Sequence, residues 1–227
     1  MIDALDLLGT LVFAVSGAFR AVKYELDILG VLVLSVATGV GGGIIRDVVL
    51  GATPPAAFRD ETYLLLCILG GLVVFVAAPT IAPRWDWVMG ADAIGLGVFA
   101  AIGAAKAADH GMGFVGIAMM AALTATGGGV VRDVMVREIP AVIRADFYAT
   151  AALLGGVALL IARSAGLPQT PQLVLAIVVT SGLRLVGMRY RLSLPKVRSL
   201  PASPSAIARA RRIRKLRMRS KRNAKRN

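Results

Sequence analysis

Residues 41–47 read Gly-Gly-Gly-Ile-Ile-Arg-Asp, and residues 127–133 read Gly-Gly-Gly-Val-Val-Arg-Asp. Both copies lie inside strongly apolar stretches. Three consecutive glycines weaken a helix because each adds backbone freedom that folding must remove. An Arg-Asp pair in an apolar stretch is also costly unless protein or water neutralises it. The occurrence of both features at two places indicates a functional region formed by the two copies.

The chain is 57% hydrophobic and 17% charged, which excludes an ordinary soluble domain. A helix needs about 20 apolar residues to cross a bilayer. Seven segments are long enough and almost without a polar face, at residues 5–22, 28–50, 62–79, 87–107, 113–136, 147–164 and 171–188. The sequence therefore predicts an all-α membrane protein with seven transmembrane helices, in a domain covering residues 1–190.

The basic residues are concentrated at the end of the chain. From Arg189 onward there are fifteen Lys and Arg and no acidic residue, whereas the preceding part has eleven basic and thirteen acidic residues. The positive-inside rule predicts that residues 191–227 form a basic cytoplasmic tail, and an odd number of spans then puts the N-terminus outside. After Ser203-Pro204 the tail could form an amphipathic helix on anionic lipid, or it could be a disordered anchor; nucleic-acid binding is not expected.

The two motif copies belong to an internal repeat with an offset of 86 residues. The offset carries Asp6, Phe13, Gly17, Thr38, Arg46 and Asp47 onto Asp92, Phe99, Gly103, Thr124, Arg132 and Asp133. The repeats cover residues 5–79 and 87–164, and each contains three predicted spans. The second copy must then enter the membrane in the opposite direction, which gives an inverted 3+3 repeat plus a seventh helix at 171–188. Such repeats are typical of transporters and some channels, whose sites lie between the copies.

We expect an ion pathway where the two copies meet. At helical spacing the threonine, the second glycine and the arginine of each copy share one face. The glycines would let the helix kink or unwind, and the freed carbonyls and threonine hydroxyls would suit a partly dehydrated cation. The predicted pathway residues are Thr38, Gly41, Gly42, Gly43, Arg46, Asp47, Thr124, Gly127, Gly128, Gly129, Arg132 and Asp133.

A structural interpretation of the same residues stays open. The glycines would then only permit close helix packing, and the charges would form the salt bridges Arg46–Asp133 and Arg132–Asp47. If the pathway conducts cations, the two arginines must be neutralised or moved aside, because an unpaired arginine in a pore repels cations.

Two further charged residues, Asp92 and Lys106, are possible lining or gating groups of the pathway. Asp92 could instead favour a helix N-terminus, and Lys106 could extend its ammonium to the membrane surface. No His/Glu metal spacing and no Ser-His or Cys-His arrangement lies in a predicted span, so the sequence predicts neither a metal site nor catalytic residues.

With these motifs, residues 1–190 resemble the prokaryotic branch of the trimeric intracellular cation (TRIC) channels, whose bacterial members have also been labelled glycine transporters. The resemblance implies a homotrimer in the bacterial inner membrane, with one pore per protomer along the second and fifth helices, kinked at the glycine triplets. It implies conduction of monovalent cations such as potassium, with bound lipid and no other cofactor. The rival function is a secondary transporter for a small zwitterion such as glycine, with Arg46 or Arg132 holding its carboxylate.

Overall fold

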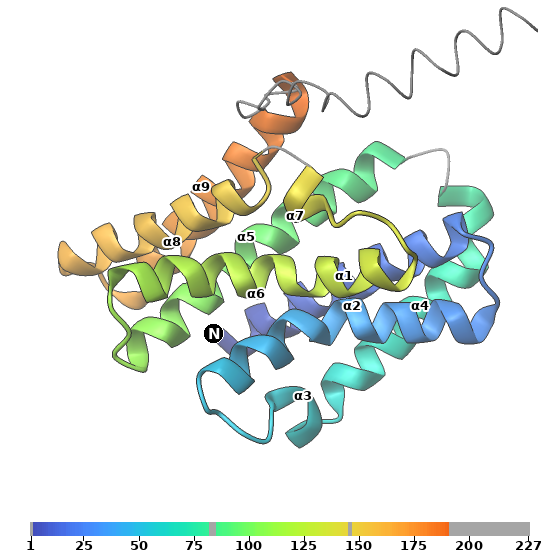
Figure 1. Cartoon of the computed structure of the whole chain (residues 1–227), viewed down its shortest axis with the longest axis horizontal. Helices are drawn as coiled ribbons and strands as arrows, with labels where there is room; N and C mark the ends of the chain where they lie inside the picture. Colours follow the sequence, from blue (N-terminus) through green and yellow to red (C-terminus); the bar gives the residue numbers. More distant parts are fainter. Residues whose placement is uncertain (1, 82–84, 145–146, 191–227) are drawn as a thin grey trace, which may run out of the picture. The chain divides into compact units, whose positions relative to one another are not determined.

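The computed structural model describes residues 2–81, 85–144 and 147–190 (Figure 1). The predicted basic tail at 191–227, with its candidate amphipathic helix, lies outside these residues. The described part contains seven long helices: α1 Ile2–Lys23, α2 Ile28–Val49, α4 Thr62–Ile81, α5 Trp85–Asp109, α6 Phe114–Met135, α8 Ala149–Ser164 and α9 Gln169–Tyr190. Each lies within a few residues of a predicted segment.

Two short helices were not expected from the sequence. They are α3 (Ala56–Arg59) and α7 (Ala141–Arg144), and each follows the glycine-containing helix of its repeat. Their first backbone amides donate to a motif aspartate: Ala56 N to Asp47 Oδ2 and Ala141 N to Asp133 Oδ2, both at 2.9 Å. The aspartate of each motif therefore fixes the loop that follows its helix.

The fold is that of an all-helical membrane protein. Five of the described helices, α1, α2, α5, α6 and α9, are long and apolar enough to cross a membrane. The apolar parts of α4 and α8 are shorter, at Thr62–Ala78 and Ala149–Ser164. Crossing of the membrane by all seven helices stays a prediction.

The helix ends follow from local chemistry. The Asp27 carboxylate caps α2 by accepting from Gly30 N at 2.7 Å, which satisfies an otherwise unpaired helix amide. Gly51, Gly111 and Gly166 follow α2, α5 and α8 with φ of 72°, 72° and 74°. This left-handed conformation terminates a helix and is readily adopted only by glycine.

The helices form two groups with the same internal packing (Figure 1). In the first group, α1, α2 and α4 pack against one another, and in the second, α5, α6 and α8 do so. The groups meet through α1 against α5 and α2 against α6, and α9 packs mainly on α5 and α8. At the α1–α5 contact the repeat-equivalent rings of Phe13 and Phe99 stack with centroids 5.2 Å apart. The opposite membrane orientation of the two groups stays a prediction.

Glycines bring the helices within each group close together. A Cβ on Gly17 of α1 would lie 2.5 Å from the Leu34 carbonyl oxygen of α2, and a Cβ on Gly103 of α5 would lie 2.7 Å from the Met120 carbonyl oxygen of α6. Helices in a membrane associate largely through such close backbone contact, because lipid leaves no hydrophobic driving force between them. The repeated glycines therefore allow a close helix contact at the same position of both groups.

Candidate functional site

The glycine triplets lie where α2 crosses α6. Both helices continue through the triplets, and no unwinding is found there. A Cβ on Gly42 would lie 2.2 Å from the Thr124 carbonyl oxygen, and a Cβ on Gly128 would lie 2.1 Å from the Thr38 carbonyl oxygen. Only glycine permits this approach, and the crossing leaves no space for an ion between these residues. A pathway along α2 and α6 must therefore run beside the crossing.

The two motif threonines face neighbouring helices rather than open space. Thr38 Oγ1 donates to its own helix at Leu34 O, at 2.6 Å. A Cβ on Gly17 would lie 2.4 Å from Thr38 Oγ1, and one on Gly103 would lie 2.5 Å from Thr124 Oγ1. Both hydroxyls thus belong to helix contacts, at positions that the repeat makes equivalent.

A first cluster of charges surrounds Arg46, which is 1% exposed. Its Nε donates to Asp47 Oδ1 at 2.8 Å, and its two terminal nitrogens donate to Asp6 Oδ1 and Oδ2 at 3.2 and 3.1 Å. Lys106 Nζ lies 3.4 Å from Asp6 Oδ2. Two cations thus meet two carboxylates, and every carboxylate oxygen has a partner, since Asp47 Oδ2 accepts from the backbone of α3. A small pocket, lined also by Thr10 and Tyr63, adjoins this cluster.

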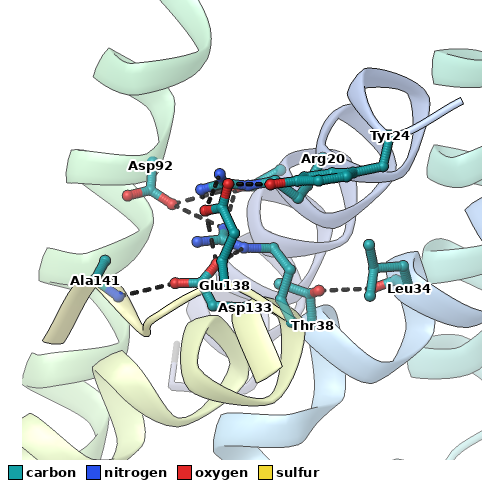
Figure 2. Close-up of polar contacts among 10 residues, drawn as sticks. Arg20, Tyr24, Leu34, Thr38, Asp92, Asp133, Glu138 and Ala141 are labelled. Atoms are coloured by element: carbon teal, nitrogen blue, oxygen red, sulfur yellow. Dashed lines mark hydrogen bonds and ion pairs between the residues drawn. The ribbon is translucent and has the colours of Figure 1, made fainter. Parts of the chain in front are cut away.

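A second cluster surrounds the equivalent Arg132, which is 4% exposed. Its Nε donates to Asp133 Oδ1 at 3.0 Å, as in the first cluster. Its Nη1, however, donates to the Ser16 hydroxyl at 2.8 Å and lies 3.8 Å from Asp92 Oδ1. Ser16 Oγ in turn donates to Asp92 Oδ1 at 3.3 Å. Figure 2 shows the Asp92 and Asp133 carboxylates turned toward these donors from α5 and α6.

Arg20 of α1 closes one side of the second cluster (Figure 2). Its guanidinium lies 3.6 Å from Asp133 Oδ1 and 3.0 Å from Glu138 Oε2. The Tyr24 hydroxyl also donates to Glu138. Arg20 is the repeat equivalent of Lys106, so the base at the end of each group's first helix contacts carboxylates of the other group.

The predicted cross-pairs Arg46–Asp133 and Arg132–Asp47 are wrong. Each arginine bonds to the aspartate that follows it, although adjacent residues point about 100° apart on a helix. The arginine side chain is long enough to fold back so that Nε reaches its neighbour. Its terminal nitrogens remain free for groups on the first helix of either repeat.

The structure also shows the contacts of Lys106 and the position of Asp92 in its helix. The Lys106 side chain is 25% exposed and its ammonium pairs with Asp6. Asp92 lies well inside α5 and not at its first turn, so it does not stabilise the helix N-terminus. Both residues thus belong to the charged clusters.

Sequence reasoning missed a residue of α9. Arg184 is 6% exposed, and its guanidinium carbon lies 4.7 Å from the centre of the Tyr148 ring of α8's N-cap. Beside it, Ser181 contacts α5 where a Cβ on Gly97 would lie 2.3 Å from Ser181 Oγ. The sequence could have identified Arg184, because it is the single arginine within the apolar segment 171–188 and a charged residue inside a membrane helix usually has a functional role.

Comparisons with known proteins show the family of the chain. Residues 3–79 and 89–164 match the protein-family model described as glycine transporter, two ranges close to the predicted repeats. The UPF0126 inner membrane protein YadS of Escherichia coli (strain K12) is 40% identical over 194 residues, covering 84% of this chain and 93% of that protein. A UPF0126 membrane protein of Deinococcus radiodurans is 42% identical over 200 residues, covering 87% and 92%.

Solved structures are similar over nearly their whole length. One, described in terms of conductance through TRIC cation channels, is 36% identical with a TM-score of 0.82, covering 88% of this chain and 98% of its own. A second, described as the TRIC trimeric intracellular cation channel orthologue from Rhodobacter sphaeroides, is 37% identical with a TM-score of 0.80, covering 84% and 98%.

Proposed function

Since the chain belongs to the prokaryotic trimeric intracellular cation (TRIC) channel family, which the glycine transporter model describes, we propose that it is a potassium-preferring monovalent cation channel. The pathway would run beside the α2–α6 crossing, past the two charged clusters. Its lining would include the motif residues on α2 and α6, with Asp92 and Lys106 as further lining or gating groups.

The pairing of both motif arginines carries this proposal. Arg46 is ion-paired with Asp6 and Asp47, and Arg132 with Asp133 and, more loosely, Asp92. An unpaired arginine would oppose the entry of a cation, whereas the charge of a paired arginine is neutralised by its carboxylate partners. Cation conduction requires both arginines to be neutralised, and these ion pairs meet that requirement.

The same pairing argues against a zwitterion transporter. A transporter for glycine needs a cationic group or a helix N-terminus to hold the substrate carboxylate. The guanidinium of Arg46 already donates from all three nitrogens to two aspartates, and α2 is unbroken, so this half presents neither feature to a substrate. We therefore place glycine transport second.

The proposed assembly is a homotrimer in a bacterial inner membrane, with one pore in each protomer. Support comes from the relatives, which include an inner membrane protein and a channel described as trimeric. The N-terminus would lie outside and the basic tail in the cytoplasm, where it could contact anionic lipid. Neither catalytic activity nor a cofactor is part of the proposal.

The test is the reversal potential of the purified full-length protein in a planar bilayer under a KCl gradient. Unitary current steps that reverse near the potassium equilibrium potential would support the channel. Reversal near the chloride potential, or substrate-dependent glycine uptake without unitary steps, would contradict it.

A matched pair of variants excludes a contaminating channel. Asp133→Asn removes a buried carboxylate of the second cluster, whereas Asp109→Asn changes a side chain that is 48% exposed and paired with Arg163 on the surface. The current amplitude should change in the first variant and stay at the wild-type value in the second.

A further inference from the structure

One of the clustered aspartates keeps a carboxylate oxygen without a partner. Ser16 and Arg132 both contact Oδ1 of Asp92, and no described residue bonds to its Oδ2. Figure 2 shows the dashed contacts reaching only one of the two oxygens. The Asp92 side chain is 11% exposed, so the carboxylate is mostly buried, although Oδ2 itself is not fully enclosed. Both oxygens are used in the other three aspartates of the clusters, Asp6, Asp47 and Asp133.

The bond between Asp92 and its arginine is also weaker than the equivalent bond in the first cluster. The Arg132–Asp92 contact is 3.8 Å long, whereas the equivalent pair makes two contacts of 3.1 and 3.2 Å. Ser16 is the cause, because its hydroxyl takes the Nη1 donor of Arg132 at 2.8 Å. The position equivalent to Ser16 in the second repeat is Ile102, which has no hydroxyl. The first cluster therefore lacks this competitor.

A second difference between the repeats leaves Asp92 without a basic partner from α1. By analogy with Lys106, Arg20 should contact Asp92, but it pairs with Glu138 at 3.0 Å. The residue equivalent to Glu138 is Ala52. In each repeat this residue donates its backbone N–H to the backbone carbonyl oxygen of the motif aspartate, Asp133 or Asp47, at 2.8 Å. Glu138 thus draws Arg20 to the α6–α7 loop.

Besides Arg132, α9 places a second and more distant positive charge, Arg184, near Asp92. Arg184 acts electrostatically on the Asp92 carboxylate but makes no ion pair with it, and its guanidinium rests on the Tyr148 ring. An opposite charge nearby makes a buried carboxylate less costly to keep ionised. Because α9 lies outside the two repeats and packs mainly on the second group, the repeat provides no equivalent of Arg184 for the first cluster.

We propose that Asp92 Oδ2, with the Ser16 hydroxyl beside it, binds the permeating monovalent cation, whereas the equivalent Asp6–Arg46 pair is structural. The inference rests on the proposed channel function. A cation that reaches Asp92 gains a carboxylate oxygen without breaking a strong ion pair, and water completes its coordination. A single carboxylate binds weakly enough to let the ion leave, as conduction requires.

The test uses thermal unfolding of the purified full-length protein in detergent, with KCl compared with N-methyl-D-glucamine chloride at equal ionic strength. A ligand that binds the folded state raises the midpoint by mass action. We expect a potassium-dependent rise for the wild type and for Asp109→Asn, and its loss in Asp92→Asn. The matched variant Asp6→Asn should have a lower midpoint in both salts and keep the potassium-dependent rise.

One further variant keeps the proposal testable if Asp6→Asn does not fold. Ser16→Ala releases Arg132 Nη1 to pair with Asp92, so the potassium-dependent rise should shrink.

An undiminished potassium-dependent rise in Asp92→Asn overturns the site, and so does its loss in a folded Asp6→Asn protein. The unfolding assay tests the cation site, and the current measurement tests the channel function, so each claim can be refuted separately. Absence of cation currents in the wild type would refute the channel function. Normal currents together with a potassium effect that survives Asp92→Asn would refute the site alone.

Discussion

Replacing Gly42 with alanine tests the α2–α6 crossing directly. The added Cβ would lie 2.2 Å from the Thr124 carbonyl oxygen, a backbone atom that cannot rotate away. The two helices must then move apart by about 1 Å to restore an ordinary contact, which also loosens the reciprocal contact at Gly128. Such overpacking costs about 1–3 kcal/mol.

The neighbouring Gly43 supplies the matched control. A Cβ there would meet only Arg46 Nη2, at 3.7 Å, which is ordinary van der Waals contact. Both alanine variants gain about 1 kcal/mol of helix propensity, so this contribution cancels between them. Gly42→Ala should therefore be less stable than Gly43→Ala by about 1–3 kcal/mol, or roughly 2–12 °C in the unfolding midpoint.

The assay is far-UV circular dichroism of the purified variants in detergent during heating. A midpoint for Gly42→Ala equal to that of Gly43→Ala would refute the close crossing. Gly128→Ala, whose Cβ would lie 2.1 Å from the Thr38 carbonyl oxygen, should behave like Gly42→Ala.

Three double-mutant cycles on unfolding free energy test contacts between helices. Arg46→Gln and Asp6→Asn should couple by about 1 kcal/mol or more, whereas Arg46→Gln and Asp133→Asn should be additive within about 0.5 kcal/mol; the reverse result would restore the cross-pairing. Phe13→Leu and Phe99→Leu should couple by about 0.5–1.5 kcal/mol if their rings stack between α1 and α5, and additive losses would contradict that contact.

The long helices were predictable because each is an apolar run bounded by polar residues or glycine. The predicted segment 28–50 becomes α2, Ile28–Val49, and 171–188 becomes α9, Gln169–Tyr190. The four-residue helices α3 and α7 were not predictable, because one turn shows no periodicity. A carboxylate from the preceding helix holds each of them in place.

The role of the glycine triplets needed the structure. Glycine in a membrane helix can unwind it or let a neighbour approach, and the local sequence is the same in both cases. The triplets lie at the point where α2 meets α6, so here they permit approach. Whether a glycine triplet unwinds its helix or permits close packing depends on a second helix that is distant in the sequence.

For the charged residues, the sequence identified the positions, whereas their contacts needed the structure. Their presence in apolar segments, at equivalent places in two repeats, singled out Arg46, Arg132 and Asp92 from the sequence alone. The predicted partners of these residues were wrong or missing, because several of the observed contacts come from other helices. Ser16 lies on α1 and Arg184 on α9.

By itself the sequence determined the apolar helices, their duplication and the residue types available at equivalent positions, because these depend on local composition and spacing. Tertiary structure alone decided that the two equivalent clusters differ. The free oxygen of Asp92 results from a hydroxyl on α1, an arginine on α6 and the absence of a basic partner from α1, and only the packing of helices distant in sequence decides these contacts.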